Sequence, residues 1–97
     1  MKAIFIAFDQ AYYEQIIAIL NNNNVRGFTR WEEVQGRGSK TGEPHFGTYA
    51  WPSLNSAMLV MVDPEKVRTL LDQLRKLDLT SDLMGLRAFV WNIEDGI

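Results

Sequence analysis

Two short apolar runs, each followed directly by helical spacing, constrain the fold of this chain more than any other feature. Residues 2–8 and 57–62 are dominated by apolar residues that favour strands, and both runs are too short for a helix. After each run, apolar residues recur at i, i+3, i+4 and i+7, the spacing of one helix face: Tyr13, Ile16, Ile17 and Leu20, then Val67, Leu70, Leu71 and Leu74. The chain is therefore expected to contain two strand–helix units.

The limits of both helices are marked by residues that favour a start or a stop. Asparagine tolerates the left-handed conformation used at helix C-termini, so the run 21–24 is expected to end the first helix. Asp63 can accept hydrogen bonds from unpaired helix N–H groups, and Pro64 suits the first helical position. We therefore expect the second helix over about 64–77.

Two further strands, over 25–35 and 86–93, complete the order βαββαβ. With right-handed crossovers, this order gives an α+β ferredoxin-like sandwich, in which both helices cover one face of a four-stranded antiparallel sheet. The 97 residues, 1–97, fit a single domain. Its long loop, about 38–56, lies in a span rich in Gly, Pro, Ser, Thr and Asn, and a loop of that length in a compact domain is usually functional or disordered.

Two of the predicted strands carry apolar residues on both faces. The first sets Ile4 and Ile6 against Phe5 and Phe8, and the third sets Met58 and Val60 against Leu59 and Met61. A sheet with one face in water should instead alternate apolar and polar residues. We therefore expect the second face to be buried against another subunit in a closed homo-oligomer, with Trp91 in the core or at the same contact.

Composition excludes several classes of function. Ten basic against twelve acidic residues give a net charge of −2, which removes any general electrostatic reason to bind nucleic acid or an anionic membrane. There is no cysteine for a disulfide or a thiolate metal site, and no basic segment leading into a signal-peptide core. No apolar run approaches the roughly 20 residues that span a bilayer. We expect a cytoplasmic protein without membrane insertion.

The exit of the second strand is the first candidate for a binding site. Gly36 and Gly38 can take backbone angles closed to other residues and allow main-chain N–H groups to approach a ligand. Arg37 and Lys40, beside them, could hold a diffuse negative charge. The alternative, left open by the residues alone, is that the glycines only shape a turn and the two cations are solvated.

Across nearly the whole chain, these segments resemble the nitrogen-regulatory P-II signalling family. The resemblance is carried by VRGFT at 25–29, EVQGRG at 33–38, the long loop, the strand 57–62, and Asp63 with Pro64. It implies a homotrimer whose sheets face inward, with a ligand site in the cleft between neighbouring subunits. It also implies ATP or ADP as the effector, and a long loop that inserts into or blocks a partner enzyme, transporter or regulator.

The resemblance also implies roles for individual residues. Thr29 corresponds to the family's threonine on the adenine side of the ligand, and Arg87 to the basic residue that enters the last strand. The backbone cradle at the base of the long loop corresponds to Gly36, Arg37 and Gly38, with Lys40 just beyond.

The chain departs from the family pattern in four places. Residues 79–86 keep only Gly85 of the usual glycine-rich phosphate loop, and the sequence stops at Ile97, before the family's C-terminal arginines. The long loop is shorter than usual and lacks the modified-tyrosine motif, and one extra residue separates Thr29 from Glu33. We therefore expect a divergent member that binds a changed effector, without uridylylation at Tyr49.

The long loop carries residues with two further interpretations. Its aromatic residues, Phe46, Tyr49 and Trp51, either fold back over the sheet or dock a partner protein. His45 and Glu43 suggest a metal site completed by three subunits, as in the divalent-cation-tolerance proteins that the architecture also resembles, whereas a lone solvated histidine is the simpler interpretation. The sequence offers no nucleophile and no paired carboxylates for catalysis, so we do not expect an enzyme.

Overall fold

The order of the elements follows the predicted pattern of two strand–helix units. The computed structural model describes residues 1–36, 54–80 and 85–97. Its strands and α-helices are β1 (Lys2–Asp9), α1 (Tyr13–Asn22), β2 (Thr29–Val34), β3 (Asn55–Val62), α2 (Val67–Asp78) and β4 (Arg87–Asn92). Two short 3-10 helices, η1 (Gln10–Tyr12) and η2 (Pro64–Lys66), lead into α1 and α2. None of the helices in these described ranges is long and apolar enough to cross a bilayer.

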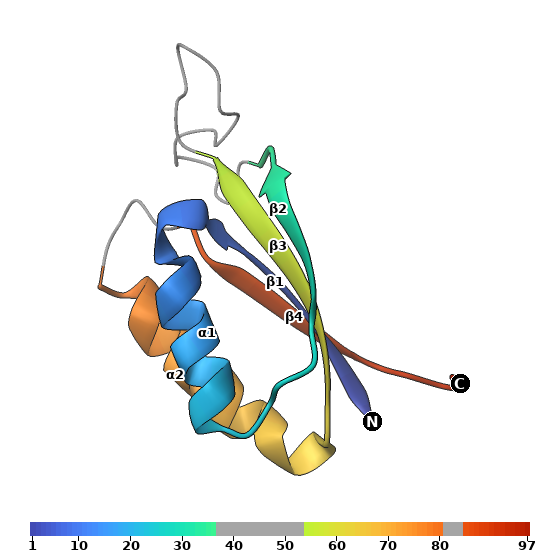
Figure 1. Cartoon of the computed structure of the whole chain (residues 1–97). Coiled ribbons are helices and arrows are strands. Elements are labelled where there is room, and N and C mark those ends of the chain that lie inside the picture. The colour runs from blue at the N-terminus through green and yellow to red at the C-terminus, as the bar shows by residue number, and fades with distance from the viewer. Residues whose placement is uncertain (37–53, 81–84) are drawn as a thin grey trace.

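The four strands form one antiparallel sheet in the order β2-β3-β1-β4. Both helices lie on the same face of this sheet, and no other described element covers the opposite face (Figure 1). The predicted α+β sandwich with a four-stranded antiparallel sheet is therefore confirmed.

The core lies between the sheet and the two helices. Even-numbered residues of β1 and β3 meet the apolar stripes of α1 and α2 there: Ile4, Ile6, Phe8, Met58, Val60, Val62, Ile16, Leu20, Leu70 and Leu74. The sequence analysis set Phe8 opposite Ile4 and Ile6, and this assignment was wrong. Side chains alternate along a strand with a period of two, so Phe8 shares the core face with Ile4 and Ile6 and is fully buried.

The opposite face of the sheet, which we call the open face, is apolar as well. Four large side chains on this face remain about half exposed in the single chain: Trp31 at 47%, Met61 at 49%, Phe89 at 60% and Trp91 at 48%. Phe5 of β1, which pairs with Phe89, lies among them. The predicted two-sided apolar character of the sheet is confirmed, and Trp91 belongs to the open face rather than to the core.

The second strand begins at Thr29, four residues later than predicted. The Asn24 backbone has a φ of 57°, in the left-handed region, and the Val25 N–H donates to the Leu20 carbonyl oxygen at 2.9 Å. This arrangement closes the end of α1. Because the Val25 N–H is used to end the helix, the chain needs residues 25–28 to reach the sheet. The asparagine run ends the helix as predicted, although Asn21 and Asn22 still belong to it.

Two smaller boundaries also differ from the sequence expectations. The third strand begins at Asn55 rather than at residue 57. Pro64 opens the first turn before α2 as predicted, but the Asp63 side chain makes no capping hydrogen bond. The Asp63 carbonyl oxygen accepts from the Lys66 N–H instead, at 3.0 Å.

A β-bulge interrupts β2 between Trp31 and Val34. Trp31 pairs with Ala57, whereas Val34 pairs with Asn55, so β2 has one more residue than β3 over this stretch. The Ser56 hydroxyl donates to the Glu32 carbonyl oxygen within the bulge. The bulge places Val34, rather than Glu33, with Trp31 on the open face, where both line the same concavity.

The bulge is also held from the helix side of the sheet. One guanidinium nitrogen of Arg30 donates to the Ser56 hydroxyl at 3.3 Å, and the guanidinium carbon lies 3.6 Å from the centre of the Tyr13 ring. This cation–π contact ties β2 to α1. The residues that precede the bulge are therefore fixed to the core, and the chain changes direction only after them.

Candidate functional site

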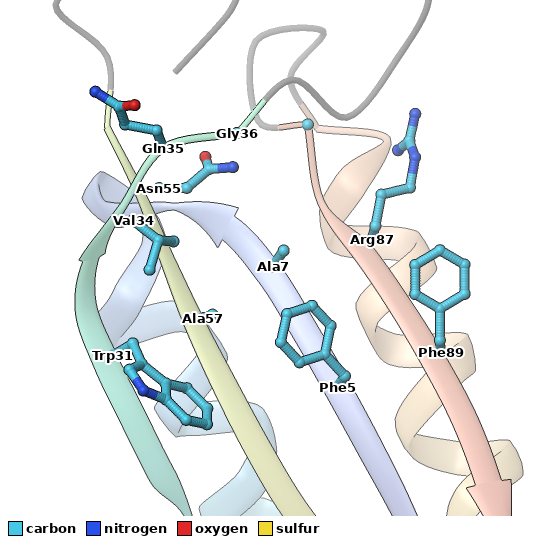
Figure 2. A pocket seen from close by; sticks show the side chains of 11 residues that line it. Phe5, Ala7, Trp31, Val34, Gln35, Gly36, Asn55, Ala57, Arg87 and Phe89 are labelled. Atoms are coloured by element: carbon cyan, nitrogen blue, oxygen red, sulfur yellow. The ribbon is translucent and has the colours of Figure 1, made fainter. Parts of the chain in front are cut away.

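A concavity of about 600 Å³ lies on the open face. It is at the end of the sheet where β2 finishes and where β3 and β4 begin (Figure 2). Its floor is apolar and is formed by Phe5, Ala7, Trp31, Ala57 and Phe89. Its rim is formed by Gln35, Gly36, Asn55, Gly85 and Arg87. An apolar floor with a few polar groups at the rim is the usual construction of a small-molecule site.

Gly36 is required at this rim by the position of Asn55. A Cβ atom at residue 36 would lie 2.6 Å from the Asn55 Nδ2 atom, closer than real Cβ contacts come. Asn55 is itself buried, with 5% of its surface exposed, so its amide has little room to move. Gly36 does not have a positive φ. The expected reason for this glycine, a special backbone angle, was therefore wrong, and close approach of the Asn55 side chain takes its place.

Replacing Gly36 by alanine is expected to lower the free energy of unfolding by about 1–3 kcal/mol, because the new methyl group overpacks the rim. Urea denaturation at a fixed protein concentration measures the change. Gly27→Ala is the matched control, since nothing lies within 4 Å of a Cβ atom at that position. In the Asn55→Ala background the cost of Gly36→Ala should fall. An equal cost in both backgrounds would show that the collision with Asn55 is not the cause.

Arg87, the first residue of β4, stands at the rim above Phe89 (Figure 2). Its Nη1 atom donates to the Leu86 carbonyl oxygen at 2.7 Å and lies 3.9 Å from the Asp78 Oδ2 atom. The Leu86 N–H donates to the other carboxylate oxygen of Asp78 at 3.2 Å. Gly85 has a φ of 59°, which an L residue adopts only with strain, so a glycine is favoured at the turn into the strand.

The structure brings some of the predicted ligand residues together and separates another from them. Gly36 and Arg87 line the same concavity although they are far apart in the sequence, and Gly85 lies with them on the rim. Thr29 is exposed and begins β2 opposite Leu59, at the other end of the strand. At about 3.3 Å per residue, Thr29 lies on the order of 20 Å from Gly36.

The remaining predicted residues lie outside the described ranges. These are Arg37, Gly38, Lys40, Glu43, His45, Phe46, Tyr49 and Trp51. The ligand, metal and partner roles expected of them stay predictions. Within residues 1–36, 54–80 and 85–97, no three His, Asp or Glu residues are grouped so that they could hold a metal ion.

Sequence reasoning missed three contributors to the site. Asn55 was assigned to the loop, because it follows a Gly- and Pro-rich span and nothing in the sequence marks it as buried. Trp31 and Phe89 lie in two of the predicted strands, and the alternation of side chains along each strand could have placed them on the open face beside Phe5. The alternation rule was available for all three aromatic residues.

Comparison with known proteins gives one family and a set of similar folds. The model of the family described as nitrogen regulatory protein P-II matches residues 1–97. None of the curated protein sequences matches the chain at a significant level.

Among solved structures, the chain is similar to a PII-like signalling protein from Thermus thermophilus, with 17% identity, a TM-score of 0.71, and coverage of 95% of this chain and 85% of that one. It is also similar to CPII, a nitrogen regulatory PII-like protein from Thiomonas intermedia, in a structure bound to ADP, AMP and bicarbonate. The identity there is 17% and the TM-score 0.74, over 97% of this chain and 88% of that one. A second CPII structure, bound to ADP and bicarbonate, gives a TM-score of 0.72 at 17% identity, with the same coverage of 97% and 88%. At this identity the likeness shows a shared fold.

Proposed function

The chain belongs to the nitrogen regulatory protein P-II family, and we propose that it binds a small anionic effector between the subunits of a homotrimer and regulates a partner protein through the long loop between residue 38 and the start of β3. It is a P-II-like signalling protein, and P-II proteins are regulators rather than enzymes. An adenine nucleotide is the first candidate for the effector, because CPII, which shares the fold, is bound to ADP and AMP.

The observation that supports this proposal best is the meeting of Gly36 and Arg87 at one concavity. The base of the long loop and the start of the last strand thereby contribute to the same rim. Arg87 supplies a positive charge, and a guanidinium can hold a phosphate or carboxylate through two parallel hydrogen bonds. Effector contacts at the loop base would order the loop and so change its fit to a partner.

The trimer is supported by the open face. Exposed apolar patches of this kind usually mark interfaces, and a second and third copy of the chain would cover Trp31, Met61, Phe89 and Trp91. In such an assembly the site lies in a cleft between neighbours, so Thr29 of one subunit can complete a site that begins at Gly36 of another. Arg37, Gly38 and Lys40 are proposed to extend the cradle from the rim.

The long loop between residue 38 and the start of β3 is proposed as the output of the signal. Phe46, Tyr49 and Trp51 would anchor an enzyme, a transporter or another regulator, because aromatic residues dominate the energetic centres of protein interfaces. We propose that the protein acts in the cytoplasm. His45 and Glu43 remain the residues to substitute if copper, zinc or nickel is found to bind.

The proposal is tested by isothermal titration of the purified protein with ATP, ADP, AMP and bicarbonate. We expect binding of at least one of these anions, and a tenfold or greater loss of affinity in Arg87→Gln, since a hydrogen bond to a charged group contributes about 1.5–3 kcal/mol. Arg68→Gln is the matched control, because Arg68 lies on the exposed surface of α2 and is not among the residues around Arg87. No heat with any of the four ligands would refute the nucleotide and bicarbonate versions of the proposal.

A further inference from the structure

The last residue of α2 and the first residue of β4 form an ion pair at the edge of the proposed site. The Asp78 Oδ2 atom lies 3.9 Å from Arg87 Nη1, and the Asp78 and Arg87 side chains are 32% and 40% exposed. Among the described residues, Arg87 is the one cation that lines the concavity. The same guanidinium that would bind an effector therefore already has a negative partner within the subunit.

The position of Arg87 lets its side chain serve either partner. It lines the concavity on the open face, and it also lines a smaller hollow of about 140 Å³ on the helix side, together with Leu71, Leu74 and Asp78. Because β4 is an edge strand of the sheet that the described residues form, the two hollows lie on either side of this strand. The contact with Asp78 draws the guanidinium toward α2, and an anion in the concavity would draw it back over the sheet.

We propose that Asp78 is a specificity-determining residue that competes with the anionic effector for Arg87. This inference rests on the proposed function, since it needs an anion in the concavity. The contact is long and part-exposed, and pairs of this kind shift an equilibrium by no more than about fivefold. Asp78 therefore weakens the binding of an effector to Arg87 by a modest factor and does not block the site.

Competition by a charged residue also discriminates between ligands. Every ligand that binds Arg87 must displace the Asp78 carboxylate, and a ligand with more negative charge is also repelled more strongly by that carboxylate once it is displaced. Removing the charge of Asp78 should therefore favour ATP more than ADP, and ADP more than AMP. The residue would tune the site toward effectors of lower charge.

The substitution Asp78→Asn isolates this effect. The introduced amide carries an oxygen in place of Oδ1 that can still accept the Leu86 N–H, so the turn into β4 keeps its hydrogen bond while the charge is lost. We expect affinity for ATP, ADP and AMP to rise about two- to fivefold, with the largest gain for ATP. Titration calorimetry at low and high salt measures this, and the gain should shrink at high salt because the repulsion is screened.

Two further variants make the result specific. Asp72→Asn removes the same charge from the same helix, where Asp72 pairs instead with Arg75 and Arg68, and it should leave affinity unchanged. In the Arg87→Gln background, Asp78→Asn should give a smaller gain than in the wild type, because competition for Arg87 is gone and only the repulsion of the ligand is relieved. The urea midpoint of each variant shows whether its fold is intact.

The outcomes separate this inference from the proposed function. If the wild-type protein binds a nucleotide and Asp78→Asn binds it equally well or more weakly, competition by Asp78 is refuted while the proposed function stands. Weaker binding would mean that Asp78 orients Arg87 toward the ligand. If the wild-type protein binds none of the anions, the proposed function fails, and this inference fails with it.

Discussion

Replacing Phe89 by glutamate is expected to convert the proposed trimer into monomers. Phe89 is 60% exposed in the single chain and lies at the centre of β4 on the open face. In an assembly with inward-facing sheets, the new carboxylate would be buried without a partner at each subunit contact, at a cost of several kcal/mol. Each 4 kcal/mol or so weakens association about a thousandfold. Sedimentation velocity at micromolar concentration measures the mass directly.

The control for this experiment is Leu79→Glu. Leu79 follows α2, lies away from the open face and is 80% exposed, so the same charge there should leave the assembly intact. Met61→Glu provides a second test on the open face, outside the concavity, and should dissociate the protein as Phe89→Glu does. A wild-type protein that sediments as a monomer, or a Phe89→Glu variant that remains a trimer, would contradict the proposed assembly.

The second large effect is expected from Phe8→Ala. Phe8 is fully buried between the sheet and the helices. Replacing a buried phenylalanine by alanine lowers the free energy of unfolding by about 3–5 kcal/mol, because apolar burial is lost and a cavity is left in the core. The loss arises within one subunit. Urea denaturation is therefore expected to give the same destabilisation at low and at high protein concentration.

Phe5→Ala is the natural comparison, because Phe5 lies on the same strand and faces the other way. Its effect should appear mainly as weaker assembly in sedimentation, and its destabilisation in urea should depend on protein concentration. If Phe8→Ala unfolds the protein altogether, Phe8→Leu should show the same pattern with a smaller loss. Equal, concentration-independent losses for Phe5→Ala and Phe8→Ala would argue against an interface on the open face.

Much of the fold could be predicted from local patterns in the sequence. The spacing of Ile16 and Leu20, and of Leu70 and Leu74, places one apolar stripe on each helix, and the structure buries these four residues together. The antiparallel sheet and the sharing of one sheet face by both helices followed from the order of the elements and the handedness of crossovers. The boundaries of the elements were less predictable. β2 starts late because the Val25 N–H donates a hydrogen bond to the Leu20 carbonyl oxygen, and no residue pattern in the sequence indicates this bond.

The candidate site could be predicted only in part. Resemblance to the family pointed to Gly36 and Arg87, and the structure places both on one rim. The contact between Gly36 and Asn55 depends on the register of β2 against β3, which the bulge changes by one residue. Asp78 also gave no signal, because it looks like any other acidic residue at the end of an amphipathic helix.

The bulge in β2 is a place where the strand can change its length without a change in the core. Upstream of it, Arg30 and Tyr13 hold the strand to the helical layer. Within the bulge, β2 has one more residue than β3, and Trp31 still pairs with Ala57. Related chains could therefore gain or lose a residue at this point and re-aim the segment that follows, exploring new ligands while the scaffold stays the same.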